Sequence, residues 1–382
     1  MNQDRIGVMH LTDTLDAGGL ERVAVNIANV LPRQRYESHL CTTRRDGSLS
    51  HFVNKDVRRL RLNRTGRFDV MAIRKLIAYI NDHQIRILHA HGSSLFIARI
   101  ATLLCQNVHI IWHDHYGRYL EQERPVWLYK SATTGIGGVI AVNESLACWS
   151  RNKLRLASDK VWYVPNFVCP EIQATEAVKL PGTSGSRIVC VANLRPQKDH
   201  LNLLRAMQIV KRNMPQAHLL LIGNGSDQSH IARIKSEIKA LNLESDISML
   251  GERQDVQAIL NSCDIGVISS ASEGLPLALI EYGMAGLPVV ATNVGQCAEV
   301  LDNGQAGILV PPNTPDSLAD AILSLLINRE RAIELGENLR KRTEAKYSVN
   351  AVINRITEIY ETVLNPSLIQ ASHLKDQFDL AN

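Results

Sequence analysis

The chain has 382 residues, of which 45% are apolar and 21% charged, so its composition is that of a globular protein and excludes wholesale disorder. The formal net charge of +4 does not indicate a nucleic-acid partner. No apolar run approaches the ~18 residues of a membrane-spanning helix, and charges stand at the N-terminus, so we expect neither a membrane span nor a signal peptide.

The first 168 residues alternate between strand-like and helix-like segments. An apolar strand is predicted at 6–12, and the helix that follows, "LERVAVNIANVL", has apolar residues at i, i+4, i+7 and i+8. The loop between them contains Gly18 and Gly19, whose backbone N–H groups can approach a phosphate closely. A simple strand-to-helix loop is the alternative. Further strands are predicted at 38–43, 85–91, 108–112, 137–143 and 161–166, and further helices at 70–82, 93–105 and 144–154.

A basic run, "RRLRLNRTGR", occupies residues 58–67. The first 168 residues are net basic and the rest of the chain is net acidic, an asymmetry that suggests different partners for the two halves. The run favours contact with an anionic membrane surface, where each basic residue contributes about 1 kcal/mol. A solvated loop explains the run as well.

Two histidine pairs, His89 with His91 and His113 with His115, stand at the ends of predicted strands. Because side chains alternate along a strand, both members of a pair lie on one face. Four histidines near one strand edge could bind a metal ion, which gives a histidine-based metallohydrolase as an alternative function. We expect instead hydrogen-bonded histidines in a polar cleft and no metal, since no cysteine or paired acid completes a ligand set.

A change of composition separates the two halves of the chain. The stretch "CPEIQATEAVKLPGTSGS" is rich in Pro, Gly and Ser and predicts a linker at 169–186. A second alternating series follows it, then an amphipathic helix within 347–365 and a polar tail at 366–382. Strands are predicted at 187–194, 218–223, 247–251, 265–270, 288–292 and 307–311, and helices at 199–213, 228–242, 255–262, 277–285 and 315–327.

Two series of alternating strands and helices predict an α/β fold with two Rossmann-like, doubly wound domains that face a central cleft. The predicted domains are residues 1–168 and 187–346. In such sheets, ligands bind beyond the carboxyl ends of the strands, so the loops at those ends are where functional residues are expected.

The turn after the first strand of the second domain carries Arg195 and Lys198, and Asp199 has the position of a helix N-cap. Two cations beside a helix N-terminus form an anion site. Arg can bind phosphate oxygens in a bidentate manner, whereas Lys acts as a point charge. A solvated basic turn is the alternative.

The stretch "SEGLPLALIEYGMAGLPVVATNVG" places Glu273 in a loop and Glu281 inside the helix that begins near Pro276, roughly 7.5 Å further along its axis. Carboxylates accept hydrogen bonds from vicinal hydroxyls, so this pair suits a sugar or a ribose. The N–H groups of Gly274 and Leu275 can donate to hydroxyls or phosphate. The alternative is a helix cap and a surface acid, but an acid in so apolar a helix seldom lacks a role.

Taken in order, these motifs resemble those of the retaining family 4 glycosyltransferases, the glycosyl transferases group 1 with the GT-B fold. The resemblance covers the chain up to about residue 364 and is carried by the Gly18–Gly19 loop, "WHDH", "NLRPQKDH" and "SEGLPLALIEYGMAGLPVVAT". The last stretch matches the family's E-x7-E motif. The resemblance implies that the second domain binds a nucleotide-sugar donor and that the helix at 347–365 crosses back to the first domain.

The resemblance also implies roles for single residues. Arg195 and Lys198 match the positions that neutralise the donor's diphosphate, and Glu281 matches the acid that binds the ribose hydroxyls. Glu273 matches the contacts to the donor sugar. The backbone of three residues takes part in the same contacts: Gly274, Leu275 and Pro276.

In the first domain, Gly19 would approach the diphosphate, and His113 best matches the histidine near the transferred sugar, with His115 as the competing position. Arg253 and Asp255 lie where such proteins form the nucleobase pocket.

The function implied is a retaining, metal-independent hexosyltransferase without a cofactor. Its donor would be a UDP- or GDP-linked sugar and its acceptor a glycan or a lipid-linked glycan, in cell-surface polysaccharide biosynthesis such as lipopolysaccharide or capsule. The alternatives are a GT-B sugar phosphorylase or epimerase, and a catalytically degenerate sugar-nucleotide-binding protein. The seven scattered cysteines form no CxxC pair and indicate reduced thiols. We therefore expect a cytoplasmic protein, with peripheral contact at the inner face of the plasma membrane.

Overall fold

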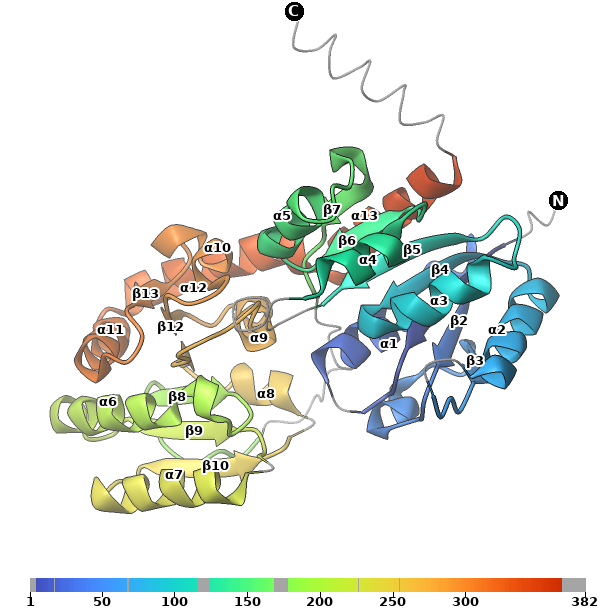
Figure 1. The fold of residues 1–382 in the computed structure, drawn as a ribbon. Helices are drawn as coiled ribbons and strands as arrows, with labels where there is room; N and C mark the ends of the chain where they lie inside the picture. Colours follow the sequence, from blue (N-terminus) through green and yellow to red (C-terminus); the bar gives the residue numbers. More distant parts are fainter. Residues whose placement is uncertain are drawn as a thin grey trace, which may run out of the picture. The chain divides into compact units, whose positions relative to one another are not determined.

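The structure, a computed structural model, describes residues 5–16, 18–66, 69–115, 124–167, 178–225, 227–253 and 255–365. The chain divides into two compact units (Figure 1): unit 1 is Met1–Asn166 with Val349–Asn382, and unit 2 is Phe167–Ser348. Of the linker predicted at 169–186, residues 169–177 lie outside the described residues, as does the tail predicted at 366–382.

The described strands of unit 1 form one parallel sheet in the order β3-β2-β1-β4-β5-β6-β7. Its register places His10 opposite His89 and His91 opposite His113, so histidines of three neighbouring strands meet at the carboxyl end of the sheet. The strands are β1 (Ile6–Thr12), β2 (Tyr36–Thr42), β3 (Arg58–Arg61), β4 (Ile85–His91), β5 (His109–Asp114), β6 (Gly138–Ala141) and β7 (Val161–Tyr163).

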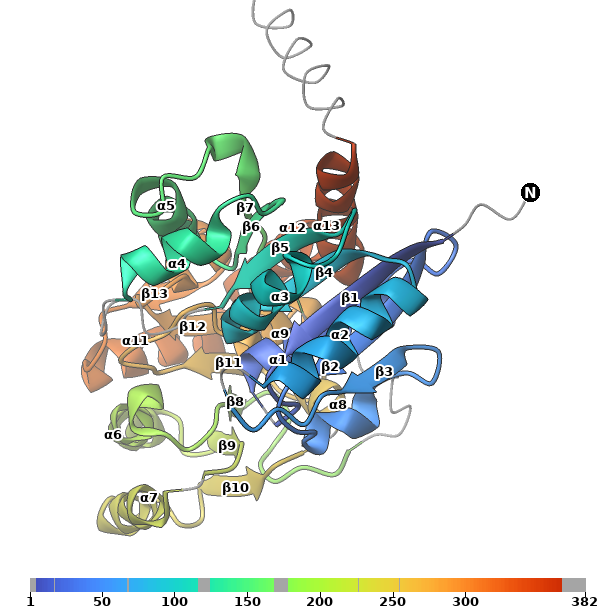
Figure 2. The same cartoon turned by 45° about the vertical axis from the view of Figure 1, so that its right-hand side comes forward.

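Helices cover both faces of this sheet (Figures 1 and 2). Leu76, Leu95 and Trp112 belong to the largest apolar core of the unit, whereas Val25 and Ala28 belong to a smaller one. The α-helices are α1 (Gly19–Val30), α2 (Val70–Asp82), α3 (Leu95–Thr102), α4 (Val126–Thr133), α5 (Glu144–Asn152) and α13 (Val349–Leu364), and the 3₁₀ turns are η1 (Ser48–Phe52), η2 (Gly92–Ser94) and η3 (Ser158–Lys160).

The sequence analysis missed strand β3, which lies inside the basic run. Leu60 and Leu62 are buried, at 8% and 7% exposure, and they alternate with exposed arginines. That alternation is the pattern of a strand with one buried face. The run was instead interpreted by its positive charge. Charged side chains are nevertheless common on edge strands, because they discourage pairing with other chains.

Helix α13 packs on unit 1 although it ends the described chain. The buried Tyr360 contacts the ring of Tyr36 edge-on, at 5.8 Å between ring centroids, and its hydroxyl lies 2.6 Å from Nδ1 of His89. Glu361 pairs with Arg35 at 2.6 Å. The last helix therefore contributes to the core of unit 1 and holds one of the histidines at the end of the sheet.

Unit 2 contains a second parallel sheet, whose described strands have the order β10-β9-β8-β11-β12-β13 (Figure 2). The strands are β8 (Arg187–Val191), β9 (His218–Ile222), β10 (Ile247–Gly251), β11 (Ile265–Ile268), β12 (Val289–Thr292) and β13 (Ile308–Val310). The α-helices are α6 (His200–Asn213), α7 (Gln228–Ala240), α8 (Val256–Leu260), α9 (Leu277–Ala285), α10 (Cys297–Val300), α11 (Pro315–Ile327) and α12 (Arg329–Tyr347), and the 3₁₀ turns are η4 (Pro196–Lys198) and η5 (Asp302–Gly304). Two doubly wound sheets confirm the predicted α/β class.

Helix α12 was also missed, because only a narrow stripe of it is buried: Ala332, Leu335, Gly336, Leu339, Thr343 and Tyr347. It packs closely on α9. A Cβ added to Gly283 would lie 2.3 Å from Cγ2 of Thr343, and one added to Gly336 would lie 2.4 Å from the carbonyl oxygen of Gly286. Small residues thus allow the close approach of α12 to the helix that carries Glu281.

Among the described residues, no helix combines the length and the apolar character that crossing a membrane requires.

Candidate active site

The turn that follows β8 carries Arg195 and Lys198, as predicted, and the two differ in their surroundings. Lys198 lies at the end of η4, and its Nζ lies 2.6 Å from Oε1 of Glu273. Arg195 is exposed, and within the described residues its guanidinium makes no hydrogen bond or ion pair. Asp199 caps α6 as predicted, in a left-handed conformation, by accepting from the N–H of Asn202 at 3.2 Å. Because Asp199 occupies that helix N-terminus, the two cationic side chains are the groups available to an anion.

The side chain of Glu273 is only 8% exposed and has two polar partners. Oε1 accepts from Lys198 and from the hydroxyl of Ser270, each at 2.6 Å. The hydroxyl of Ser269 donates to the carbonyl oxygen of Lys198 at 2.9 Å, and the N–H of Ala271 donates to Gln197 at 2.9 Å. The loops after β8 and β11 are therefore joined by side-chain and backbone bonds, which holds the carboxylate and the ammonium group together.

The segment from Gly274 to Pro276 leads directly into α9. Within the described residues, the N–H groups of Gly274 and Leu275 donate no hydrogen bond, and Pro276 is the N-cap of α9 without a side-chain acceptor. Such N–H groups at a helix N-terminus can donate to a polar or anionic ligand. The structure thus leaves the donors that were predicted for the sugar contacts free for a ligand.

Glu281 lies in the second turn of α9 and is half-buried. The next residue, Tyr282, is buried under the sheet, and its hydroxyl accepts from the N–H of Val191 at 2.7 Å. A Cβ on Gly266 would lie 2.7 Å from the Tyr282 ring, so β11 approaches the ring closely. Tyr282 therefore fixes the rotation of α9, and with it the direction of Glu281.

Arg253 and Asp255, predicted for a nucleobase pocket, pair with each other. The guanidinium of Arg253 donates to both carboxylate oxygens of Asp255, at 2.7 and 2.5 Å. This bond raises the pKa of Arg253 and lowers that of Asp255. The pair follows β10, whose last residue, Gly251, has a φ of 68°.

In unit 1, Gly18 is the N-cap of α1 and Gly19 is its first residue. Within the described residues, no side chain caps this helix, and a Cβ added to Gly19 would meet nothing within 4 Å. Neither glycine has a positive φ. The backbone at Gly19 is therefore open for close approach of a ligand, whereas the carboxylate of Glu21 lies against Gly18.

The predicted histidine pairs do share one face, and His10 of β1 joins them. The rings of His89 and His91 are stacked, with 4.6 Å between their centroids, and those of His113 and His115 lie 4.0 Å apart. His113 is 2% exposed, whereas His115 is partly exposed. Nδ1 of His113 lies 3.0 Å from Nε2 of His89, and its own Nε2 has no partner within the described residues.

Burial keeps these histidines neutral. It lowers the pKa of His10 and of His115 to about 3. It also places the pKa of His89, His91 and His113 well below the usual value, and the neighbouring histidines add to the effect.

Comparison with known families fits this geometry. The model of the "Glycosyltransferase Family 4" matches residues 17–172, and that of the "Glycosyl transferases group 1" matches residues 173–342. The chain belongs to the family 4 glycosyltransferases. The two matches meet at residues 172 and 173, shortly after unit 2 begins at Phe167, and together include every predicted site residue from Gly18 to Glu281.

The individual relatives of this glycosyltransferase described next are distant in sequence. The UDP-Gal:alpha-D-GlcNAc-diphosphoundecaprenol alpha-1,3-galactosyltransferase of Escherichia coli is 23% identical over 93% of this chain and 97% of its own length. The GDP-mannose-dependent monoacylated alpha-(1-6)-phosphatidylinositol monomannoside mannosyltransferase of Corynebacterium glutamicum is 27% identical over 50% and 52%. The crystal structure of Anabaena Alr3699/HepE with UDP and glucose has a TM-score of 0.77 and 18% identity, covering 94% of this chain and all of that one. That likeness shows the GT-B fold.

Three residues of the candidate site were not predicted from the sequence: Ser270, Gly295 and His10. Ser270 lies two residues after the last residue of the buried strand β11, a position where polar residues of parallel sheets meet. Gly295 has a φ of 54°, and a Cβ there would lie 2.3 Å from the carbonyl oxygen of Glu273. The N–H of Gln296 donates to Gly274 at 2.9 Å, so this loop supports the Glu273 segment. A glycine three residues after the strand "PVVAT" was the available signal.

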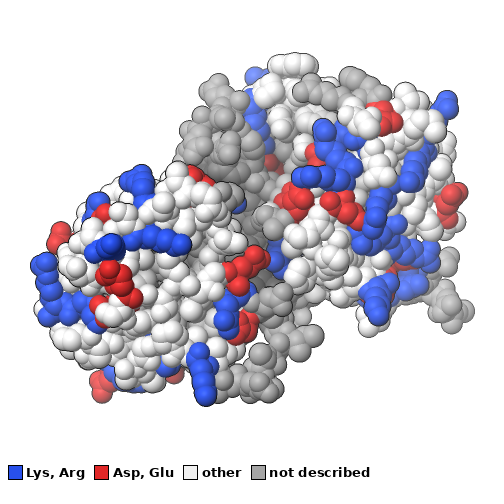
Figure 3. All heavy atoms as spheres, turned by 90° about the horizontal axis from the view of Figure 1, so that it is seen from below, with Lys and Arg blue, Asp and Glu red and all other residues white. Residues whose placement is uncertain are grey.

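The arginines of the glycosyltransferase's basic run are paired with acids, a feature that the sequence analysis did not predict. Arg58 pairs with Glu37, Arg59 and Arg61 with Asp46, and Arg64 with Asp13, at 2.6–3.2 Å. Arg67 lies outside the described residues. On the face drawn in Figure 3, Lys and Arg side chains are likewise interspersed with Asp and Glu. These acids offset the positive charge on which the predicted membrane contact rests.

A cavity of about 310 Å³ lies elsewhere in unit 2. Ile265 and Pro288, at the amino ends of β11 and β12, line it together with Arg329 and Arg340 of α12. It is therefore at the opposite end of these strands from Glu273 and the other predicted donor contacts.

Proposed function

We propose that this family 4 glycosyltransferase transfers a sugar from a UDP- or GDP-linked donor to a glycan or lipid-linked acceptor, with retention at the anomeric carbon. The observation that supports this proposal most strongly is the arrangement of side chains at the carboxyl end of the unit 2 sheet. There, within the part of the chain that the structure describes, the Lys198–Glu273 pair is accompanied by the unpaired guanidinium of Arg195 and by N–H groups before α9 that donate no hydrogen bond. Cations, hydroxyl acceptors and N–H donors together match a sugar diphosphate.

Pairing with Glu273 leaves Lys198 able to bind phosphate. An ammonium group has three N–H donors, and Glu273 occupies one of them. The carboxylate therefore orients Lys198 while two donors remain for phosphate oxygens. Arg195 has no competing partner within the described residues and can bind the diphosphate in a bidentate manner.

The proposed reaction takes place on one face of the donor sugar. The acceptor oxygen forms a bond to the anomeric carbon on the face from which the diphosphate departs, and the departing phosphate oxygen takes the acceptor's proton. Arg195 and Lys198 stabilise the negative charge that develops on the leaving group. In this proposal these side chains supply the positive charge, and the transfer requires neither a metal ion nor a cofactor.

Glu281 is assigned to the ribose hydroxyls and Glu273, with the backbone of Gly274, Leu275 and Pro276, to the donor sugar. The contacts predicted for Gly19, His113 and Arg253 stay predictions. The UDP-galactose named for the E. coli relative and the GDP-mannose named for the C. glutamicum relative support both donor classes.

The lipid-linked and phosphatidylinositol acceptors in these two names support a lipid-linked acceptor and a place in surface polysaccharide synthesis. We therefore keep cytoplasmic location with peripheral membrane contact as part of the proposal. The acids beside the basic run predict that such contact is weak, because surface charges of opposite sign lie within one Debye length of each other.

A donor screen tests the function. The melting temperature is measured with UDP, GDP, ADP and their common sugar conjugates, each with and without EDTA, and stabilised donors are then incubated with a lipid-linked acceptor. We expect stabilisation by one nucleotide class, unchanged by EDTA, and transfer with retained anomeric configuration by NMR.

Other outcomes point to the alternatives. Sugar release that requires inorganic phosphate would indicate a phosphorylase, and interconversion of the donor sugar an epimerase. Nucleotide binding without turnover of any donor would indicate a degenerate binding protein. No nucleotide binding, or activity abolished by EDTA, would contradict the proposal.

A further inference from the structure

Histidines at the carboxyl end of the unit 1 sheet form a cluster that the proposed transfer uses at only one position, His113. The cluster comprises His10 of β1, His89 and His91 of β4, and His113 and His115 at the end of β5. Each ring lies within 5.5 Å of another, centroid to centroid. Because all five are held neutral by burial, each offers an imidazole lone pair.

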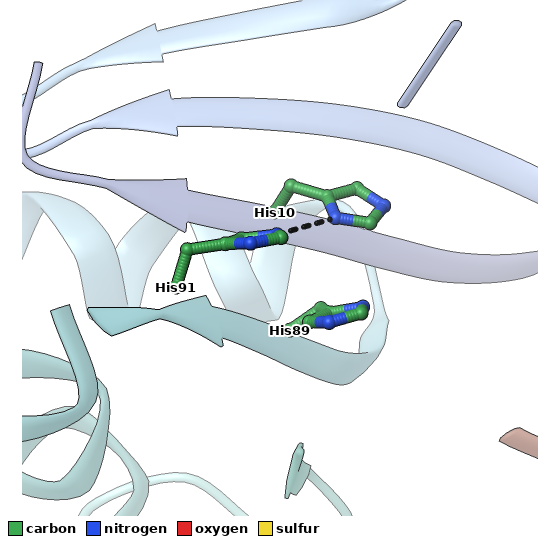
Figure 4. A group of neighbouring side chains, drawn as sticks. All are labelled: His10, His89 and His91. Atoms are coloured by element: carbon green, nitrogen blue, oxygen red, sulfur yellow. Dashed lines mark hydrogen bonds between the residues drawn. The ribbon is translucent and has the colours of Figure 1, made fainter. Parts of the chain in front are cut away.

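Two groups of three within this cluster place one nitrogen per residue within 4.8 Å of the others. The first group is His10, His89 and His91 (Figure 4), in which Nδ1 of His10 lies 3.2 Å from Nε2 of His91. Both nitrogens of His89 are already bonded, to Tyr360 and to His113. All three side chains are at most 1% exposed, so this group has neither a free third ligand nor access.

The second group is His91, His113 and His115, in which the facing nitrogens of His91 and His115 bond to each other and become available to an ion once His115 carries its proton on Nδ1. Nδ1 of His91 lies 3.0 Å from Nε2 of His115. Nε2 of His113 is buried and without a partner within the described residues. Tetrahedral Zn²⁺ with Zn–N bonds of 2.0–2.1 Å places its nitrogens about 3.4 Å apart. To admit an ion, the His91–His115 contact would open by a few tenths of an ångström, and the nitrogen of His113, which lies within 4.8 Å of the other two, would move closer to them.

The other ring nitrogens of His91 and His113 are bonded as an outer shell requires. His91 can donate from Nε2–H to Nδ1 of His10, which leaves its own Nδ1 as a lone pair. His113 can donate from Nδ1–H to Nε2 of His89, which leaves its Nε2 free. His89 then donates from Nδ1–H to the hydroxyl of Tyr360. Outer-shell partners of this kind fix the tautomer and the ring orientation of metal-binding histidines.

We propose that His91, His113 and His115 bind one divalent transition-metal ion of the Zn²⁺ class, with the fourth coordination position open. Three neutral imidazoles suit Zn²⁺, Ni²⁺ or Cu²⁺, whereas Mg²⁺ and Ca²⁺ prefer oxygen ligands. The partial exposure of His115 gives the ion a route to the two buried ligands.

The ion is inhibitory, because it occupies the nitrogen of the histidine assigned to the transferred sugar. This consequence rests on the proposed function, whereas metal binding itself does not. The two are therefore measured separately, first as binding to the protein without donor and then as transfer in the presence of the ion.

Binding is measured on full-length protein without an affinity tag, treated with EDTA and then titrated with Zn²⁺ against a chromophoric chelator. We expect one ion per chain and no competition from Mg²⁺. X-ray absorption at the zinc edge should show imidazole nitrogens at about 2.0–2.1 Å. In His115→Asn the affinity should fall by more than the roughly 10- to 100-fold that follows loss of an outer-shell partner. The matched control, His51→Asn, changes an exposed histidine of η1 and should bind like the wild type.

Several results would overturn the site. They are the absence of saturable binding by the wild type, an H115N affinity equal to that of the wild type, or sulfur atoms in the zinc shell. The absorption spectrum of the wild type decides the matter even if a variant folds poorly. Zinc bound at the histidines without loss of transfer would refute the inhibition alone. Failure of the donor screen would leave the binding result intact.

Discussion

The carboxyl ends of the two parallel sheets carry polar side chains of opposite character. In unit 2 the groups are charged and neutralise one another, as Lys198 and Glu273 do at 2.6 Å. In unit 1 they include imidazoles that burial keeps neutral, beside the buried Asp114–Arg124 ion pair. Within the described residues, two of these imidazoles retain a nitrogen without a partner, His10 and His113. The same topological position thus supports two chemistries. Fixed charge suits an anionic donor, and neutral lone pairs suit hydroxyls or a soft cation.

The largest expected effect is a loss of activity when a positive charge is removed at the candidate site rather than elsewhere in unit 2. Lys198→Ala should lower kcat on the order of 100- to 1,000-fold, because it removes a donor that stabilises the leaving diphosphate. The matched control is Lys211→Ala, which breaks a similarly buried ion pair with Asp246 at 2.7 Å. Both variants should lose similar thermal stability and only Lys198→Ala its activity. Equal turnover in the two would remove Lys198 from the site.

Glu281→Gln tests the acid of α9. A hydrogen bond to a charged group contributes about 1.5–3 kcal/mol, so the donor KM should rise roughly 10- to 100-fold with little change in kcat. Glu334→Gln, an exposed acid of α12, is the control. An unchanged KM, or a loss confined to kcat, would contradict the assignment to the ribose.

The neutral cluster of unit 1 should make stability fall with acid. Below about pH 6.5 its histidines bind protons when unfolded but not when folded, so their contribution is present above pH 6.5 and is lost as the pH falls. His115, with a folded pKa of about 3, should contribute up to about 1.4 kcal/mol per pH unit, a value that is reached as the unfolded side chain becomes fully protonated below pH 6.5. Urea unfolding of His115→Asn between pH 6.5 and 5 should show a slope smaller by that amount. His109 is only half-buried, so His109→Asn should change the slope less. Equal slopes for the wild type and the two variants would contradict the account.

The smallest expected effect is a difference in unfolding free energy between variants of two buried tyrosines whose rings are in contact. Tyr360→Phe removes the hydroxyl bound to His89 and leaves a buried ring nitrogen unsatisfied, which should cost about 1–3 kcal/mol of unfolding free energy. The hydroxyl of Tyr36 has no partner within the described residues, so Tyr36→Phe should be nearly neutral. Denaturant midpoints measure both, and equal losses would show that the bond to His89 contributes nothing.

Much of the fold could be predicted because its strands are apolar runs and its helices have clear periodicity. The strand at Ile6–Thr12 and the helices at Val70–Asp82 and Leu277–Ala285 have the expected bounds. Strand β3 was missed because its charge obscured the alternation of Leu60 and Leu62. Helix α12 was missed because a narrow buried stripe carries little periodic signal.

The candidate site was predicted where one motif contains its residues, as with Glu273 and Glu281. What could not be predicted depends on contacts between separate strands. The pairing of Lys198 with Glu273, the support from Gly295 and the approach of His10 to His91 each follow from the sheet order β8-β11-β12 or β1-β4-β5. Sequence spacing carries no information about such pairs.

The most direct test of the central claim is hydrogen exchange of the protein with and without saturating UDP or GDP. The account predicts that one of them slows exchange in residues 192–200 and 270–282, where Lys198, Glu273 and Glu281 lie. Unchanged exchange in both segments, or protection confined to the distant cavity at Ile265 and Pro288, would contradict it.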